Sequence, residues 1–592
     1  MMLITDVTNS PVVHRTLVLV LMCGVFFCAR SAKDDSSLLL DLCDRLKHAN
    51  GARGPDSQDS RRVSVTGSDG LHTFVLDLFA SELQLRGSQH IVQPHERDNN
   101  IFCWNGEIFD GLDIAQDEND GVKLFRVLSD ASTVEEVYNL FGTIEGPYAF
   151  VYYNANSQRV FFARDPLGRR SLLIHKPNVR NPYFFLTSVS TGSDPACEFE
   201  ELSTKYIYCL ELRVLLNSGD TMSAFDSCTT RFPRNSSAGV LYSEPCRVNT
   251  VLPPDDWPLI TGLESPDYLI QVVDELINQL DRSVELRVRD IPQARSAAAR
   301  VAVLFSGGID STVLAFLAHK HIPLDEPIDL LNVAFENPRK INGQTPMNNT
   351  KARRKPQKPE ANATPPYMVP DRVTGIQEVE ELRKLCPRVW NFVEVNVPYG
   401  ESQASHPLVE SLMFPGRTVM DLSLALALYF ASRGSGVVRD HPDSEPVAYN
   451  TPARVLLNGL GSDELLGGYG RHRTAYGTGG WKGVIDELQL EIDRIPSRNL
   501  GRDDRVISSH GKETRHPFLS LTFVSFVARL PVHFKMDPRV ETGLGDKMLL
   551  RLAAKKMGLA EASSRKKRAM QFGSHSARME GEKRGDVSID LK

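Results

Sequence analysis

Two glycine-containing loops hold residue types that suit the binding of phosphate groups. Residues 305–311 follow an apolar run, open a helix-like run and include Ser306, Gly307 and Gly308. A serine and two glycines let backbone N–H groups and a hydroxyl surround phosphate oxygens at a helix N-terminus, where the helix dipole favours an anion. Asp310 is out of place in an anion site unless a divalent cation such as Mg²⁺ bridges it to the phosphate. A Gly-Gly turn with a capping aspartate is the alternative, but the strand-loop-helix context favours the phosphate site.

The second loop, residues 457–469, repeats this arrangement later in the chain. It also follows a strand-like run, and it carries Asp463 between glycines. Asp463 could hold the same metal ion from the opposite side of the phosphate. Together the two loops predict a site for a magnesium nucleotide.

The elements around these loops alternate between strand and helix patterns. Residues 268–280 repeat apolar side chains at three- and four-residue steps, which is typical of an amphipathic helix, and 312–319 also form a helical run. Apolar runs predict buried strands at 300–305, 329–335, 390–397 and 454–459. Continuous apolar strands separated by helices indicate a parallel sheet that is covered on both faces.

The chain before residue 195 follows a different pattern. Short strand-like runs with turn residues between them predict a mostly β structure there. Residues 196–260 are irregular and end in a proline-rich stretch, so they predict a connection between domains. Residues 336–372 are rich in proline, asparagine and basic residues and have almost no apolar side chains, which predicts a disordered insertion.

The overall composition excludes several classes of protein. Of 592 residues, 41% are hydrophobic and 24% charged, which is typical of a soluble folded chain and excludes a polytopic membrane protein. The 68 basic and 74 acidic residues give a net charge of −6, so we expect neither nucleic acid nor a membrane as partner. The nine cysteines include no CxxC pair and no zinc-type spacing, so we expect neither a disulfide scaffold nor a zinc site.

In these motifs the chain resembles the asparagine synthetase family. That family's ATP-pyrophosphatase domain has an SGGxDS loop and a later GxGSDExxGGY loop, and here the two matching loops occur in order at 306–311 and 459–469. Further agreement lies at 502–505, 511–519 and 567–572. The amino-acid sequences of residues 322–335, 497–507 and 567–574 are more similar still to the family's asparagine synthetase domain-containing branch.

The resemblance implies a fold and a division into domains. The expected fold is an α+β N-terminal class II glutamine amidotransferase sandwich of the Ntn-hydrolase type, followed by an α/β ATP-pyrophosphatase domain with a parallel sheet. The expected boundaries are an N-terminal extension at 1–22, the amidotransferase domain at 23–195, the connection at 196–260 and the synthetase-like domain at 261–592.

The resemblance also implies roles for residues of the ATP site. Leu304 and Val333 would line the adenine pocket, while Asn458 and Gly459 would present backbone to the nucleotide. The pyrophosphate would be held by Ser306, Gly307, Gly308, Asp310 and Ser311. Asp310 and Asp463 would bind Mg²⁺. Lys567 would neutralise charge as an acyl-adenylate forms, although a solvated basic patch is the alternative for a lysine among basic neighbours.

The amidotransferase domain of this family begins Met-Cys-Gly, which matches residues 22–24. The Cys23 thiolate would attack the glutamine carboxamide, and the free α-amine of the same residue would accept its proton. This chemistry needs Cys23 as the first residue, so either translation starts at Met22, or residues 1–22 are removed, or the site is inactive.

Further residues of the glutamine site follow from the same resemblance. Arg86 would bind the glutamine carboxylate as a bidentate pair. The Asn105 side chain and the Gly106 N–H would stabilise the oxyanion. Glu107 and Asp120 would bind the substrate's ammonium group.

The apolar run at residues 17–29 has two interpretations. Its length and basic flank fit a secretory signal peptide, and its apolar character equally fits the buried first strand of a two-sheet sandwich. We favour the strand, because a magnesium-nucleotide site has little to act on outside the cell. The sequence therefore predicts a cytoplasmic enzyme.

One departure from the family leaves the substrate open. Authentic asparagine synthetases have glutamate where this chain has Leu460, and a leucine neither takes up a proton nor orients an amine. Three hypotheses follow. The chain amidates aspartate with ammonia from glutamine, it amidates or ligates another carboxylate with the same ATP chemistry, or it binds nucleotide or protein partners without catalysis. The sequence does not indicate an oligomeric state.

Overall fold

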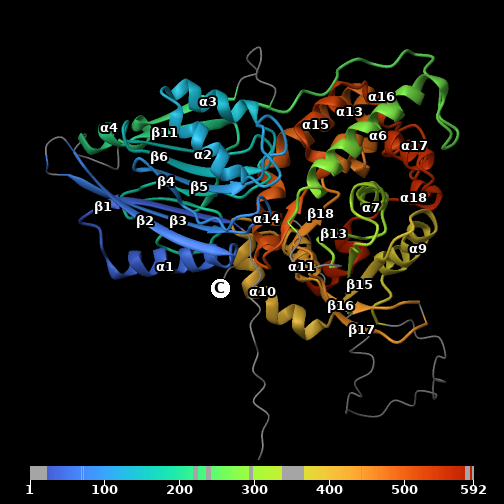
Figure 1. The fold of residues 1–592 in the computed structure, drawn as a ribbon. Helices are drawn as coiled ribbons and strands as arrows, with labels where there is room; N and C mark the ends of the chain where they lie inside the picture. Colours follow the sequence, from blue (N-terminus) through green and yellow to red (C-terminus); the bar gives the residue numbers. More distant parts are fainter. Residues whose placement is uncertain are drawn as a thin grey trace, which may run out of the picture.

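A computed structural model of the chain describes residues 23–67, 70, 72–217, 224–234, 242–292, 298–336, 366–441, 443–580 and 587–589. A β-rich N-terminal half lies beside a C-terminal half in which helices surround a sheet (Figure 1). Within those ranges we find no helix with the length and apolar character that a membrane span requires.

The N-terminal half is a sandwich of two six-stranded antiparallel sheets. The first has the order β10-β8-β9-β1-β3-β2 and consists of β1 (Gly24–Ser31), β2 (Ser57–Thr66), β3 (Thr73–Glu82), β8 (Leu173–His175), β9 (Phe184–Thr187) and β10 (Glu200–Glu201). The second has the order β12-β11-β7-β6-β5-β4 and consists of β4 (His95–Arg97), β5 (Asn100–Gly106), β6 (Tyr148–Asn154), β7 (Arg159–Arg164), β11 (Tyr206–Glu211) and β12 (Thr229–Pro233).

Helices cover the outer faces of this sandwich. They are α1 (Ser37–Gly51) on the first sheet and α2 (Asp120–Asp130) and α3 (Val134–Thr143) on the second, with the short α4 (Leu212–Asn217) and α5 (Phe225–Cys228) beyond β11. Strand β1 is central. Its Val25 and Phe27 pack between the sheets, whereas Phe26 packs against α1. The buried-strand interpretation is therefore confirmed from Gly24 onward, and residues 1–22 lie outside the described ranges.

The C-terminal half is built on a seven-stranded mixed sheet with the order β17-β16-β15-β14-β13-β18-β19. Its strands are β13 (Val301–Leu304), β14 (Ile328–Phe335), β15 (Trp390–Val397), β16 (Ser435–Val438), β17 (Val447–Asn450), β18 (Val455–Leu457) and β19 (Glu513–Arg515). The five strands β15, β14, β13, β18 and β19 are parallel, which confirms the predicted parallel sheet, although β19 was not among the predicted strands. The antiparallel hairpin β16-β17 adds an edge that the apolar pattern did not indicate.

Helices pack on both faces of this sheet, because alternate residues of its strands point to opposite sides. Val301 and Val303 lie in the core under α6 (Asp267–Val288) and α7 (Ile309–His321), and Ala302 lies in the core under α10 (Tyr399–Met413) and α11 (Val419–Arg433). The helical segments are α6 (Asp267–Val288), α7 (Ile309–His321), α9 (Pro370–Leu385), α10 (Tyr399–Met413), α11 (Val419–Arg433), α12 (Ser462–Leu466), α13 (Gly470–Arg498), α14 (Leu500–Ser508), η1 (Pro517–Leu519), α15 (Leu521–Arg529), α16 (Val532–Lys535), α17 (Met548–Lys556), α18 (Ala560–Ser564), α19 (Met570–Gly573) and η2 (Ser576–Glu580).

Two expected boundaries differ from the observed elements. Strands β10, β11 and β12 extend the sandwich to Pro233, past residue 195, because β11 pairs with β7. The insertion expected at 336–372 overlaps the start of α9, which has a proline in its first turn. Residues 337–365 of that insertion lie outside the described ranges.

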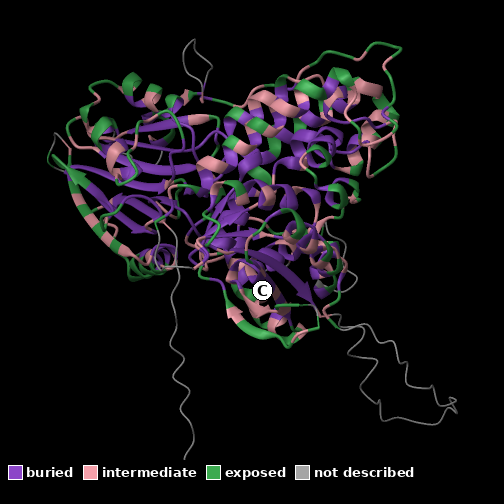
Figure 2. Cartoon of the chain, turned by 45° about the vertical axis from the view of Figure 1, so that its right-hand side comes forward, coloured by how far each residue is buried: buried purple, intermediate pink, exposed green. Residues whose placement is uncertain are grey.

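The two halves share a buried ionic contact. Asp504 of α14 accepts hydrogen bonds from Arg53 at 2.8 Å and from the Ser171 N–H at 3.0 Å, and it lies 3.5 Å from Arg170. All four residues are buried. Figure 2 shows buried residues continuing from the sandwich into the second sheet, so the halves form one packed unit.

Candidate active site

The two phosphate-type loops leave adjacent parallel strands at the same edge of the sheet. β13 pairs with β18 through Val303 and Leu457, and each strand is followed by its loop and then by a helix, α7 or α12. Crevices at the carboxyl ends of parallel strands are the usual binding sites of α/β sheets. The sheet topology therefore brings Asp310 and Asp463 together, although 152 residues separate Asp310 from Ser462 beside Asp463.

A lysine that the sequence analysis did not single out lies between the two carboxylates. The Lys547 Nζ donates to Asp310 Oδ1 at 2.8 Å and Oδ2 at 2.6 Å, and it lies 2.7 Å from Asp463 Oδ1. Lys567 pairs with the other oxygen of Asp463. The Ser462 hydroxyl donates to Asp310 Oδ1 at 2.7 Å. The four charged side chains form one cluster at the mouth of the two loops.

The charges of this cluster stabilise one another. Burial opposes the ionised form of Asp463, but the Lys547 and Lys567 ammonium groups outweigh it and hold the pKa of Asp463 well below its usual range. Burial likewise disfavours the charged form of Lys547, but Asp310 and Asp463 raise the pKa of Lys547 to about 12. Asp463 and Lys547 are therefore both charged at neutral pH.

Glycines allow the two loops to approach each other. A Cβ at Gly459 would lie 2.8 Å from the Asp310 Cβ. Gly307 has a φ of +73°, and a Cβ there would lie 2.5 Å from the Gly375 N in α9. Side chains at either position would push the carboxylate or α9 away, so packing alone requires glycine at both positions.

The remaining predicted nucleotide residues lie around this cluster. Leu304 on β13 pairs with Leu331 on β14, so Leu304 and Val333 lie on the same face of the sheet. The Ser306 Oγ accepts from the Gly308 N–H at 3.3 Å, and the Ser311 Oγ donates to the Gly308 carbonyl at 3.1 Å. The ATP-binding assignment of these residues stays a prediction. Their position close to one another around the cluster is compatible with it.

The predicted magnesium ligands offer oxygen donors from two residues. In proteins Mg²⁺ is usually held by one or two carboxylates together with substrate phosphates and water. Asp310 and Asp463 fit that donor set if a nucleotide supplies phosphate oxygens, and no group of three or more candidate ligands occurs among the described residues. Magnesium binding stays a prediction.

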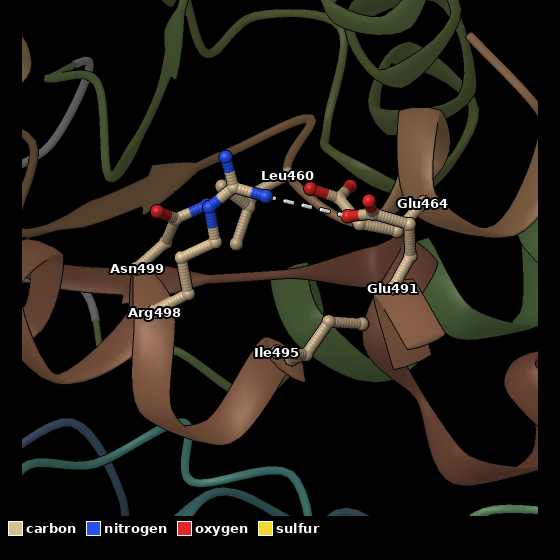
Figure 3. Close-up of a pocket in the computed structure, with 6 residues that line it drawn as sticks. All are labelled: Leu460, Glu464, Glu491, Ile495, Arg498 and Asn499. Carbon is tan, nitrogen blue, oxygen red and sulfur yellow. Dashed lines mark hydrogen bonds and ion pairs between the residues drawn. The ribbon is translucent and has the colours of Figure 1, made fainter. Parts of the chain in front are cut away.

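The Leu460 side chain faces a small cavity behind the second loop (Figure 3). The cavity is lined by Leu460, Glu464, Glu491, Ile495, Arg498 and Asn499. Glu491 lies 3.5 Å from Arg498 and pairs with Arg471 at 2.5 Å, while Glu464 accepts from the Tyr469 hydroxyl at 2.6 Å. Carboxylates thus line the neighbourhood of position 460 even though leucine stands there.

The second candidate centre surrounds Cys23 at the start of β1. The Cys23 Sγ accepts from the Leu83 N–H at 3.2 Å and lies 3.7 Å from Glu82 Oε2. Burial and the nearby Glu82 carboxylate raise the pKa of the Cys23 thiol well above its usual value. The described surroundings therefore do not produce a thiolate at neutral pH, and a base is needed to take up the thiol proton.

Asn105 on β5 offers a free hydrogen-bond donor in a buried position. Its side chain is 2% exposed, and among the described residues its Nδ2 has no hydrogen-bond acceptor. Buried amide donors are almost always paired, so an unpaired one indicates a place for a ligand atom. At Gly106 a Cβ would lie 2.7 Å from both the Pro147 carbonyl and the Trp104 ring, so only glycine fits there.

The predicted residues for the two charged ends of glutamine lie together. Arg86 Nε donates to Glu107 Oε2 at 2.9 Å, and both residues are buried. Asp120, at the start of α2, accepts from the Ile108 N–H at 2.9 Å. Burial and the Glu107 carboxylate raise the pKa of Asp120 to about 7. The Arg86 guanidinium and the Glu107 and Asp120 carboxylates thus lie together, and their role in binding the two charged ends of glutamine stays a prediction.

The sequence reasoning missed three residues of these centres. Lys547 immediately precedes α17 and has a φ of +51°. In the sequence, its position is marked by an Asp-Lys pair before an apolar helical run, which does not by itself indicate a binding residue. Tyr469 is the last residue of the second loop motif, and its ring lies 4.6 Å from the Lys567 Nζ. Arg515 of β19 reaches Glu107 across the boundary between the halves, at 3.1 Å.

The fold and the two centres define a class of protein, one in which an N-terminal glutamine amidotransferase domain is joined to an asparagine-synthase-type domain. The glutamine amidotransferase domain family matches residues 22–195, and the asparagine synthase family matches residues 477–587. The chain belongs to the family of asparagine synthetase domain-containing proteins.

Two relatives that match most of the chain carry this assignment. Asparagine synthetase domain-containing protein 1 of Homo sapiens is 36% identical, over 94% of this chain and 95% of that protein. The protein of the same name from Gallus gallus is 34% identical over 94% and 98%. Among solved structures, the glutamine phosphoribosylpyrophosphate amidotransferase from B. subtilis covers 53% of this chain and 67% of its own, with 13% identity and a TM-score of 0.25.

Proposed function

We propose that the chain is a glutamine-dependent amidating ligase of the asparagine synthetase type. Glutamine is hydrolysed at Cys23, and the ammonia is used at the second centre, where ATP activates a carboxylate. The single observation that supports this most is the meeting of Asp310, Asp463, Lys547 and Lys567 at the ends of two adjacent parallel strands. A nucleoside triphosphate requires cationic groups such as the Lys547 and Lys567 ammonium groups to balance the charge of its phosphates.

At the first centre the residues act as follows. The Cys23 sulfur attacks the carboxamide carbon, and the α-amine of Cys23 takes up the thiol proton if the chain begins at this residue. The unpaired Asn105 Nδ2 and the Gly106 N–H donate to the oxyanion. Collapse of the tetrahedral intermediate releases ammonia and leaves a thioester on Cys23. Water then hydrolyses this thioester, which releases glutamate and the free thiol. Arg86 binds the substrate carboxylate, and Glu107 and Asp120 bind its ammonium group.

At the second centre the carboxylate oxygen of the acceptor attacks the α-phosphorus of ATP and pyrophosphate leaves. Lys547 and Lys567 neutralise the charge that develops on the phosphates, and the N–H groups at the start of α7 bind the pyrophosphate. Mg²⁺, held by Asp310 and Asp463 when bound, would supply further charge neutralisation. Ammonia then attacks the acyl carbon and AMP leaves, which gives the amide.

Aspartate is the first candidate acceptor, and the product would then be asparagine. Leu460 favours testing other acceptors as well, because it removes the carboxylate that the authentic enzymes have at this position. The deciding experiment measures pyrophosphate release against a panel of carboxylic acids, with glutamine or with ammonium as the nitrogen source. Release that depends on one acid identifies the acceptor. Nucleotide binding without pyrophosphate release from any acid would contradict the proposal and favour a binding role.

A further inference from the structure

One strand joins the two centres. β19 (Glu513–Arg515) pairs in parallel with β18, and the N–H of Asn458, the first residue after β18, donates to the Arg515 carbonyl at 3.0 Å. Asn458 belongs to the loop that carries Leu460 and Asp463. A shift of that loop along the strand direction therefore acts directly on the backbone of Arg515.

The side chain of Arg515 ends in the glutamine subsite of the other half. Its Nη2 lies 3.1 Å from Glu107 Oε1, its Nε donates to Glu513 Oε1 at 2.6 Å, and its Nη1 donates to the Arg287 carbonyl at 2.8 Å. Arg515 is 3% exposed, and its Nε and Nη1 are fixed by hydrogen bonds, whereas its Nη2 contacts Glu107 as an ion pair without a hydrogen bond. Such a fixed guanidinium holds a carboxylate oxygen at a defined position.

A second path leads from the same strand to the nucleophile. Glu513 pairs with Arg170, and Arg170 lies 3.5 Å from Asp504. Asp504 pairs with Arg53 at 2.8 Å, and Arg53 Nε donates to the Cys23 carbonyl at 3.0 Å. Both the carboxylate proposed for the glutamine ammonium group and the backbone of the nucleophile are thus tied to β19.

Binding of glutamine changes the partners of Glu107. Without substrate its two oxygens are held by Arg86 and Arg515. When Arg86 binds the substrate carboxylate, Arg515 is the cation left to hold Glu107 against the ammonium group. We propose that Arg515 is a positioning residue for Glu107 that couples the nucleotide loop to glutamine binding, so that a nucleotide at the second centre changes the affinity of the first.

This inference rests on the proposed function, and it has a quantitative form. If ATP changes glutamine affinity by some factor, glutamine changes ATP affinity by the same factor, because binding free energies are reciprocal. Couplings of this kind are typically about 5- to 150-fold. We expect a change of about fivefold or more in the wild-type background and less than about twofold after Arg515→Gln.

The experiment measures glutamine binding by calorimetry in the full-length Cys23→Ala protein, with and without ATP and Mg²⁺. Arg515→Gln is compared with Arg515→Lys, which keeps the charge, and with Arg454→Gln. Arg454 is the matched control, since it also pairs across the two halves, with Asp56 at 2.8 Å, but does not touch Glu107. Thermal unfolding verifies that each variant is folded. We expect coupling to be lost in Arg515→Gln, partly restored in Arg515→Lys and unchanged in Arg454→Gln.

Kinetics with Cys23 intact separate positioning from general damage. Arg515→Gln should raise the KM for glutamine about tenfold or more and change kcat for glutamate release much less, because the oxyanion donors are untouched. Unaltered coupling in Arg515→Gln overturns the inference, and so does a wild-type background that binds both ligands without coupling; both results leave the proposed function standing. A wild-type chain that binds no nucleotide overturns the proposed function and the coupling together.

Discussion

Replacing Lys547 by methionine tests the charged cluster of the second centre directly. Methionine keeps much of the side-chain volume but removes the ammonium group that contacts Asp310 and Asp463. Asp463 keeps Lys567 as a partner, whereas Asp310 keeps, among the residues that the structure describes, the Ser462 hydroxyl at 2.7 Å. The uncompensated charge in Lys547→Met is therefore that of Asp310.

The expected cost follows from that geometry. Lys547 is 1% exposed, and removing one partner of a buried ion pair typically destabilises a protein by about 3–5 kcal/mol. For a domain of this size each kcal/mol lowers Tm by about 2–4 °C, so the C-terminal half should unfold roughly 10 °C earlier. Adding Asp310→Asn removes the orphaned charge and should recover most of the loss.

The assay is thermal unfolding of the two single variants and the double variant without nucleotide. Lys535→Met is the matched control, because Lys535 is also 1% exposed but has no carboxylate partner among the described residues. Burial alone lowers the pKa of Lys535 to about 7, so its replacement should not lower stability. A Lys547→Met protein as stable as the wild type, or a double variant no better than the single one, would refute the reasoning about the cluster.

Three further results are expected at the first centre. Burial and the Glu107 carboxylate raise the pKa of Asp120 to about 7, so this carboxyl group is protonated below that pH. The affinity of the Cys23→Ala protein for glutamine should therefore increase roughly tenfold from pH 6 to pH 8. Calorimetry of the Cys23→Ala, Asp120→Asn double variant should show no such pH dependence. Asn105→Ala should lower kcat for glutamate release about 10²–10³-fold but leave ammonium-dependent pyrophosphate release unchanged; an equal loss in both assays would contradict the oxyanion role. Mass spectrometry of the native active protein should find a chain that starts at Cys23, and an active chain with Cys23 internal would remove the α-amine from the mechanism.

The features that sequence alone predicted depend on local backbone requirements. The loops at 305–311 and 457–469 need glycine at defined positions after a buried strand, and that requirement is visible in the residue order. Strand β1 was predictable for a similar reason, since its apolar run fits a strand that is buried on both faces.

The features that sequence could not predict depend on contacts between distant segments. Lys547 meets Asp310 across 237 positions, because α17 packs against α7 in the folded chain. Arg515 reaches Glu107 only because the two halves dock. The extension of the sandwich to Pro233 likewise depends on β11 pairing with β7. The sequence of 196–260 has no regular hydrophobic pattern that would predict this pairing.

The contact of Asp504 with Arg53 and Arg170 sets a limit on how this architecture can be recombined. A chimera that takes its first half from one relative and its second from another must inherit a matching set of acids and bases at the seam. A mismatch would leave charge sealed in the interior within reach of the Cys23 carbonyl. The two halves are therefore not interchangeable between relatives. An isolated amidotransferase half would expose the interface to Asp504, so its properties would not be those of the intact protein.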